Sequence, residues 1–494
     1  MATLPTYLYT QKDPDAGTGL FASEAIPPGV EILRVDRPLV SVLDTPHLKD
    51  TCSECCLWLP ENGYGGDSQS KRLRACQGCM ITKYCCKECQ TKSWKRTHKY
   101  ECKIFAKLYP HVLPNTVRIV MQLLLRRKAI TLPDPEWRAF LDLQSHVEEF
   151  RSSQVTNEDG LTTWHTIELM SQAASSYSGS KEPVSFTQTL TARILINTHT
   201  LTTSTLDPLG LCLSPYSALL NHSCTPNTAI IFSGSTLTLR SLAAIPAKSE
   251  LSISYVDTTN PSLTRQSELR SRYFFNCTCS ACSAGITNGL PDPRPDHNFD
   301  AIKGRAVAIQ AAASTLPPDR EAALLKRALS FLSRYPPHRQ PNPSIFHTAF
   351  LNAIGTQSWA IALSYALKAY FFIDPLHYQL SWHPVRVVRK WVLLRLVTQI
   401  IGLVSAGDGR IKWLENFGIN WQIVAMGFFQ ELSDGARLSH GSNSPFAAEV
   451  KAFGEGAGMG RDKVERILLE EEWAKLRKVA DDQRETLREE GNED

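Results

Sequence analysis

Cysteine and histidine residues in closely spaced pairs are the first sign of chemistry in this chain of 494 residues. Eight of them form four pairs between positions 52 and 102: Cys52 and Cys55, Cys76 and Cys79, Cys85 and Cys89, and His98 and Cys102. Thiolates and imidazoles in closed sets of four favour structural zinc, because no position is left for a catalytic water. The spacing predicts two tetrahedral zinc sites and leaves Cys56 and Cys86 as spare thiols.

A second cysteine group lies in the middle of the chain. Cys277, Cys279 and Cys282 supply only three ligands, whereas a structural zinc ion takes four. Cys224 is the natural fourth ligand. We therefore expect a third zinc site that joins two segments distant in sequence.

Cys224 belongs to an unusual run, Asn221-His222-Ser223-Cys224-Thr225-Pro226-Asn227. It places polar and metal-capable side chains between an apolar stretch and a strand-like one, a composition that a structural turn does not need. Two more stretches call for the same explanation, Gly17-Thr18-Gly19-Leu20 and Glu250–Asp257. The glycine pair predicts a tight turn and is not a dinucleotide fingerprint, since no third glycine and helix start follow.

The elements that must position these residues are mixed in the first half of the chain. Residues 29–42 and 236–255 carry stretches that alternate in the way of half-buried strands. Between residues 102 and 197 the pattern is mostly helical, as in 117–128 and 186–197. The predicted fold class is α+β, with a strand-rich module split by inserted Cys-rich and helical material.

The second half is predicted to be helical. A Pro/Gly/Asp-rich linker covers residues 285–297, and helical patterns follow over 320–334, 346–372 and 384–405. Alternating glycines at 454–460 indicate a flexible joint, and the charged residues 462–489 indicate a solvated terminal helix. Residues 133–180 carry no functional signal.

Composition and charge argue against several classes of protein. The net charge is only +4, so nucleic acid is not expected as the main partner. No run is long and apolar enough to span a membrane, and residues 1–9 lack a secretory signal. Fourteen cysteines without such a signal indicate a reducing compartment, so we expect the protein in the cytoplasm, the nucleus or both.

The finger spacing, the Asn221–Asn227 run and the helical second half together resemble the SET-and-MYND proteins, which are SET-type protein lysine methyltransferases. The resemblance implies that Cys52, Cys55, Cys85 and Cys89 hold one zinc ion, and that Cys76, Cys79, His98 and Cys102 hold another. It also implies an order of parts: the first SET segment (1–50), the MYND finger (51–102), a helical insert (103–196), the SET core (197–257), a post-SET zinc region (258–285) and a helical C-terminal domain (299–494).

The same resemblance implies roles for individual residues. S-adenosylmethionine would be held at Gly17, Thr18, Gly19, Asn197, Asn221, His222 and Phe275. Tyr255 would be the catalytic tyrosine, and Tyr273 would line the substrate lysine channel. The zinc site of Cys224, Cys277, Cys279 and Cys282 would fold the post-SET loop over the active site. Ala16, Thr18 and Ala218 depart from the residues that are common in the family.

These residue types suit methyl transfer to a lysine of a histone or non-histone protein. The sulfonium of S-adenosylmethionine makes its methyl carbon electrophilic, and the attacking amine must be neutral. An exposed lysine has a pKa of about 10.4, which a narrow aromatic channel lowers by desolvating the ammonium. The Tyr255 hydroxyl can then hold the amine in the geometry of attack.

Two other functions stay open at this point. The three departures also suit a scaffold, a catalytically weak or inactive SET-like shell whose finger and helices bind partners. Eleven Lys and Arg residues between 71 and 107 would suit DNA binding, although nothing there looks like base readout. The resemblance favours a finger that binds proline-rich segments, on a protein expected to be a monomer.

Overall fold

The computed structural model describes residues 4–13, 17–59, 72–132, 134–156, 159–292, 296–459 and 464–481. They form two compact units, which we describe one at a time. The first unit consists of Met1–Val256 and Arg265–Cys279, and the second of Asp257–Thr264 and Ser280–Asp494.

Strands from distant parts of the sequence pair with each other in the first unit. β3 (Glu31–Val35) pairs with β11 (Thr236–Ser241), which also pairs with β10 (Thr228–Ser233). β4 (Val40–Leu43) pairs with β8 (Pro208–Leu213), which also pairs with β7 (His199–Thr202). All four pairings are antiparallel. Residues 36–235 separate β3 from its partner, so the predicted α+β class with a split, strand-rich module is confirmed.

Two smaller pairings carry the residues expected at the site. β1 (Leu8–Asp13) and β2 (Gly17–Ala22) are antiparallel, with Gly17 opposite Asp13. The tight turn expected at 17–20 is therefore wrong: these residues begin a strand, and of the four only Gly17 has a positive φ, of 81°. β9 (Asn221–His222) runs parallel to β12 (Ser252–Ile253), which brings the Asn221–Asn227 run beside residues 250–257.

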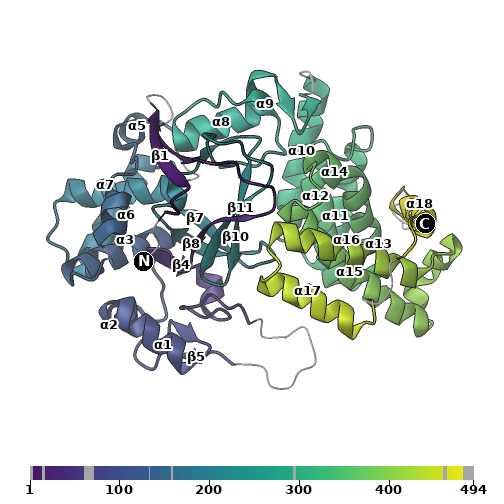
Figure 1. Cartoon of the computed structure of the whole chain (residues 1–494), viewed down its shortest axis with the longest axis horizontal. Coiled ribbons are helices and arrows are strands. Elements are labelled where there is room, and N and C mark those ends of the chain that lie inside the picture. Colours follow the sequence, from purple (N-terminus) through teal and green to yellow (C-terminus); the bar gives the residue numbers. More distant parts are fainter. Residues whose placement is uncertain are drawn as a thin grey trace. The chain divides into compact units, whose positions relative to one another are not determined.

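A cysteine-rich segment and a helical layer are inserted between β4 and β7. The cysteine-rich segment contains η1 (Thr45–Leu48), β5 (Arg74–Ala75), β6 (Lys83–Tyr84), α1 (Lys87–Ser93), η2 (Trp94–His98) and α2 (Lys99–Leu108). The helices that follow are α3 (Asn115–Lys128), α4 (Asp134–Leu141), α5 (Val147–Ser152), α6 (Thr163–Ser178) and α7 (Val184–Asn197) (Figure 1). α3 is the centre of this layer, because Ile119, Val120 and Met121 are fully buried and the helix packs on α6, α7 and β4.

The described residues of the second unit are mainly helical (Figure 1). Its longer helices are α10 (His297–Ala313), α11 (Pro318–Phe331), α12 (Asn342–Gly355), α13 (Trp359–Lys368), α15 (Pro384–Ser405), α16 (Trp421–Ser439), α17 (Pro445–Gly456) and α18 (Arg466–Asp481). The helical pattern over 384–405 is confirmed in full. The pattern over 346–372 is interrupted between α12 and α13, where Gln357 has a φ of 56°. Among helices of the described ranges, none combines the length and apolarity needed to cross a membrane.

The terminal helix differs from its prediction. α18 is not solvated, because Leu476, Val479 and Ala480 are fully buried and the helix packs on α13 and α16. The buried residues recur at the spacing of one helical face, so a few anchors suffice to dock an otherwise charged helix. Residues 482–489 of the predicted helix lie outside the described residues.

Two connecting segments also differ from expectation. Gly454 lies inside α17, where a side chain would collide with the ring of Phe429, so this glycine allows close packing and does not form a joint. The segment expected as a linker contains a short hairpin of β13 (Ile286–Thr287) and β14 (Leu290–Pro291).

Candidate active site and metal centres

The structure gathers the eight ligands of the finger into two groups. One consists of Cys52, Cys55, Cys85 and Cys89, and the other of Cys76, Cys79, His98 and Cys102. Within each group the ligand atoms lie within 4.8 Å of one another. The composition of each group is the one that the family resemblance implied.

The distances between ligand atoms suit a tetrahedral zinc ion. Sulfur ligands at about 2.3 Å from zinc lie about 3.8 Å apart at the corners of a tetrahedron. The Sγ of Cys85 lies 3.7 Å from that of Cys55 and 3.5 Å from that of Cys89. In the second group, the Sγ of Cys76 lies 3.8 Å from that of Cys102 and 3.3 Å from Nε2 of His98. Both groups therefore fit zinc.

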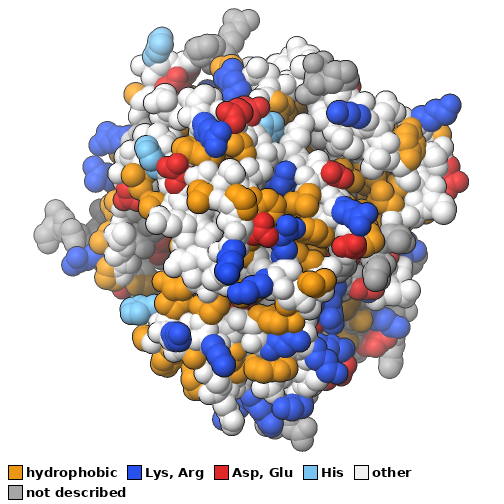
Figure 2. All heavy atoms as spheres, turned by 90° about the vertical axis from the view of Figure 1, so that its left-hand side faces the viewer, with side chains coloured by type: hydrophobic (Ala, Val, Ile, Leu, Met, Phe, Trp, Pro, Cys, Tyr) orange, Lys and Arg blue, Asp and Glu red, His pale blue; other side chains and the backbone are white. Residues whose placement is uncertain are grey.

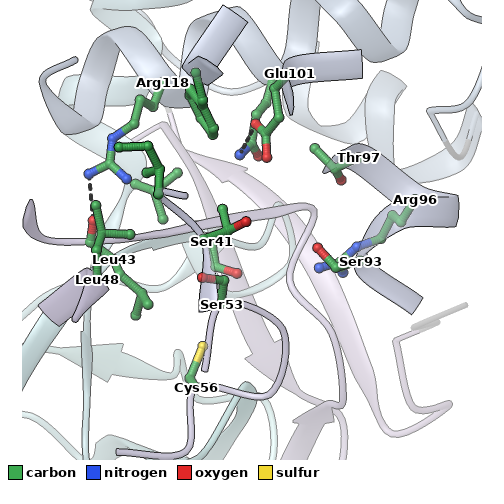
Figure 3. A pocket seen from close by; sticks show the side chains of 15 residues that line it. Ser41, Leu43, Leu48, Ser53, Cys56, Ser93, Arg96, Thr97, Glu101 and Arg118 are labelled. Carbon is green, nitrogen blue, oxygen red and sulfur yellow. Dashed lines mark hydrogen bonds between the residues drawn. The ribbon is translucent and has the colours of Figure 1, made fainter. Parts of the chain in front are cut away.

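His98 is oriented by a carboxylate behind the second group. Its Nδ1 lies 3.3 Å from Oε1 of Glu101, and the amide of Gln122 donates to Oε2 at 2.8 Å. Glu101 and Arg118 both line a small cavity of about 50 Å³ (Figure 3). A carboxylate on Nδ1 leaves Nε2 free for the metal. Sequence reasoning missed Glu101, although it lies about one helical turn after His98.

The surface of the finger is basic with apolar side chains among the charges. Its helices expose Lys87, Lys92, Lys95, Lys99, Lys103 and Lys107. Trp94 and Met80 are 46% and 51% exposed. Figure 2 shows Lys and Arg side chains gathered toward the bottom of one face, with hydrophobic side chains between them.

The third expected zinc group also forms. Cys224, Cys277, Cys279 and Cys282 bring their sulfur atoms within 4.8 Å of one another. A hydrogen bond with Cys224 lowers the pKa of the Cys277 thiol to about 3, which favours the thiolate that binds metal. Arg265, which is almost fully buried, donates from Nε to the sulfur of Cys224 at 3.2 Å. This group therefore also fits zinc.

Tyr255 is the centre of an aromatic cluster. Its ring lies 4.9 Å from that of Tyr273, 5.4 Å from that of His222 and 6.4 Å from that of Phe275, between ring centroids. The Tyr255 hydroxyl donates to the backbone carbonyl of Leu220 at 2.6 Å. Burial, followed by the nearby Tyr273 and Glu250, raises the pKa of Tyr255 above its ordinary value. The phenol is thus neutral and fixed, with oxygen lone pairs free to accept a hydrogen bond.

Asn221 is fixed by an acidic residue that sequence reasoning did not single out. Its Nδ2 donates to Oε1 of Glu250 at 2.8 Å. A Cβ at Gly19 would lie well inside van der Waals contact of that same carboxylate oxygen and 3.0 Å from Nδ2 of Asn221. The second glycine therefore makes room for the Asn221–Glu250 pair. Glu250 begins the stretch quoted from the sequence, but nothing there indicated a partner.

Gly17 and Asn197 are linked through a second residue that the sequence did not indicate. Nδ2 of Asn197 donates to the backbone carbonyls of Gln144 at 2.9 Å and of Arg193 at 2.7 Å. A Cβ at Gly17 would lie 2.5 Å from Nε2 of Gln144. Gln144 lies just before α5, in the region to which no function was given.

Both ring nitrogens of His222 have partners within the chain. Nδ1 accepts from the backbone N–H of Tyr255 at 3.0 Å, and Nε2 lies 3.3 Å from the sulfur of Cys224. Its imidazole therefore joins the third cysteine group to the backbone of Tyr255. Because both ring nitrogens are occupied, the contact with the cofactor that we expected of His222 must use its backbone or the face of its ring.

The three residues that depart from the family pattern lie in different surroundings. Thr18 is exposed on β2, and Ala218 is half-buried in η3 (Ser217–Leu219). Ala16 lies outside the described residues.

Comparison with known proteins is consistent with this geometry. Residues 17–256 match the SET domain family. The SET domain and MYND-type zinc finger protein 6 of Schizosaccharomyces pombe is 34% identical over 281 residues, which cover 56% of this chain and 52% of that protein. The Histone-lysine N-methyltransferase SMYD3 of Mus musculus is 30% identical over 270 residues, covering 54% of this chain and 59% of that protein. The N-lysine methyltransferase SMYD2 of the same species is 29% identical over 418 residues, covering 80% and 89%.

The chain thus spans little more than half the length of the first two relatives. The matched segment contains the split sheets, the finger, Asn221, His222 and Tyr255. Residues 17–256 therefore match the SET domain family, and the chain is similar to the SET-and-MYND proteins.

Proposed function

We propose that this protein is an S-adenosylmethionine-dependent protein-lysine N-methyltransferase. The observation that carries the proposal is the half-buried phenol of Tyr255, hydrogen-bonded to Leu220 and surrounded by Tyr273, Phe275 and His222. Two of the similar proteins are lysine methyltransferases by name, which supports the same chemistry.

S-adenosylmethionine fits the residues around this phenol. Gly17 and Gly19 leave the backbone of β2 without side chains where Gln144, Asn221 and Glu250 come close. The amide of Asn221 lies beside Gly19, and the amide of Asn197 donates to the carbonyl of Gln144, whose own amide lies beside Gly17. The rings of His222 and Phe275 offer faces for an adenine. When bound, the cofactor supplies an electrophilic methyl carbon.

The aromatic cluster prepares the lysine for attack. The rings of Tyr255 and Tyr273 exclude water around the incoming side chain, and desolvation lowers the pKa of a lysine ammonium. As the side chain enters and its ammonium is desolvated, the proton leaves to solvent before the amine reaches the methyl carbon. The channel thus delivers the neutral amine that methyl transfer requires.

Tyr255 orients the neutral amine. Because its hydroxyl hydrogen is donated to Leu220, the oxygen accepts an N–H of the lysine and fixes the direction of the nitrogen lone pair. Correct orientation of reacting groups supplies a large part of the rate of such transfers. The three zinc groups keep the segments that carry these residues in place and take no part in the transfer.

Partners and location follow from the same proposal. The substrate is a lysine of a histone or non-histone protein, and the basic, tryptophan-bearing surface of the finger binds proline-rich segments. The protein acts as a monomer in the cytoplasm, the nucleus or both.

Calorimetry with S-adenosylmethionine and methyl transfer to the proteins of a cell lysate test the proposal. We expect saturable binding, and we expect Tyr255→Phe to keep binding while transfer falls by about 10²-fold or more. Tyr335→Phe, whose ring packs on Phe299 in the second unit, is the matched control and should change neither. A chain that neither binds the cofactor nor transfers a methyl group would instead be the scaffold that Thr18 and Ala218 suggest.

A further inference from the structure

The three aromatic side chains of the run Tyr273-Phe274-Phe275 pack in two different places. The rings of Tyr273 and Phe275 lie beside Tyr255. Phe274, between them, has a φ of 63° and packs elsewhere. A bulky residue rarely adopts left-handed backbone, and where it does the surrounding structure must hold it there. The question is therefore what holds Phe274.

Phe274 is held by the helical insert. Its ring packs edge-to-face on Phe150 of α5, with 4.8 Å between ring centroids, and lies 5.6 Å from the ring of His146. It joins a separate small hydrophobic cluster with Ile167 of α6 and Ala192 of α7, which are both fully buried. The cluster is distinct from the main core of the first unit.

The anchoring region is also connected to the expected cofactor residues. His146 has a φ of 50° and precedes α5, and Gln144, two residues earlier, contacts both Gly17 and Asn197. Phe274 and Phe275 line an open pocket of about 430 Å³ together with Ser152 and Val155 of the insert. The same short segment thus approaches Gly17 and Asn197 through Gln144, and the aromatic run through His146 and Phe150.

We infer that Phe274 is a positioning residue, which sets Tyr273 and Phe275 against Tyr255 by inserting its own ring between α5 and α7. The inference rests on the proposed function for its effect on methyl transfer, but not for its effect on the position of the segment. The left-handed backbone at 274 sets the directions in which the rings of Tyr273 and Phe275 leave the chain, and it persists only while the contacts of the Phe274 ring hold it.

Trypsin cleavage measures the position of the segment without reference to activity. Arg270 and Arg272 are exposed at the end of α8 (Ser262–Tyr273), directly before the run. We expect Phe274→Ala and Phe150→Ala each to raise cleavage there by about tenfold, and the double variant to add little, because both remove one contact. Phe274→Leu, which keeps most of the apolar volume, should restore slow cleavage. Phe299→Ala, which breaks an aromatic pair in the second unit, controls for general loss of stability.

Affinity for S-adenosylmethionine and the kcat and KM for methyl transfer measure the consequence. We expect Phe274→Ala to lower cofactor affinity and kcat/KM by about tenfold or more at a temperature where the variant is folded, because displaced rings misalign the reacting groups. Unchanged cleavage and unchanged affinity in Phe274→Ala would overturn the inference. If the unaltered protein neither binds the cofactor nor transfers methyl groups, the proposed function fails, and the cleavage rates alone decide whether Phe274 positions the run.

Discussion

Tyr255 donates its hydroxyl hydrogen to the carbonyl of Leu220. In the proposed reaction the phenol oxygen accepts from the substrate amine, so the protonation state of the phenol matters. Burial raises the pKa of Tyr255 above the ordinary value of about 10. The phenol therefore stays protonated across the range in which a lysine in solution loses its proton.

The rate of methyl transfer should accordingly rise with pH and show no decline near pH 10. Single-turnover rates from about pH 7 to about pH 10.5 would measure this profile, with ordinary tyrosine titrating near 10 as the reference. A decline centred near pH 10 that Tyr255→Phe abolishes would mean that the phenol ionises there, contrary to its burial.

Gly19 offers a sharp test of the Asn221–Glu250 pair. In Gly19→Ala the new methyl group would collide with the Glu250 carboxylate, which must then leave the Asn221 amide. We expect calorimetry to give a cofactor affinity lower by about tenfold or more, because a hydrogen bond to a charged group contributes about 1.5–3 kcal/mol.

Gly304→Ala is the matched control for this change. Gly304 lies in α10, and no atom lies within 4 Å of a Cβ added there. Alanine favours a helix over glycine by about 1 kcal/mol, so this variant should bind the cofactor normally and melt slightly higher. Equal affinities in the two variants would contradict the role given to Gly19.

At the scale of elements, two leucines of α18 test whether this helix is docked or solvated. Leu476 is fully buried in the second unit, whereas Leu468 on the same helix is 41% exposed. Leu476→Ala should lower the free energy of unfolding by about 2–5 kcal/mol. Leu468→Ala should change it by less than about 0.5 kcal/mol. Thermal denaturation would compare them, and equal, small effects would mean that the helix is solvated as its charge suggested.

The elements also mark how far the sequence could be interpreted. The zinc groups were predictable because most of their ligands lie within one knuckle or helical turn of another ligand. α15 was predictable because its 22 residues contain no proline after Pro384 and a single glycine, Gly402. Glu250, Gln144 and Phe274 were not, because each acquires its role from a partner that only the tertiary fold brings near. The left-handed backbone at Phe274 has no local signal, since the sequence there reads as an ordinary aromatic run.

At the scale of the whole molecule, metal content is a simple test. Elemental analysis should give three zinc ions per chain, and Cys279→Ser should give two, because removing one ligand opens a closed fourfold site. We expect this variant to lose cofactor binding while the finger stays folded, since Cys224 is tied to Tyr255 through His222.

Cys86→Ser is the control for metal content. Cys86 is exposed, belongs to none of the three groups and caps the start of α1, a position that serine also favours. Three zinc ions and full cofactor affinity are expected. Unchanged cofactor affinity in Cys279→Ser would show that cofactor binding does not depend on the third zinc site.

The pairing of β3 with β11 has a consequence for synthesis on the ribosome. The finger and the helical insert emerge before β11 does, so early in translation β3 has no partner and its apolar residues Ile32 and Leu33 stay uncovered. A premature stop codon anywhere in that interval would leave a nascent chain with an exposed strand edge, which is a site for aggregation and chaperone capture.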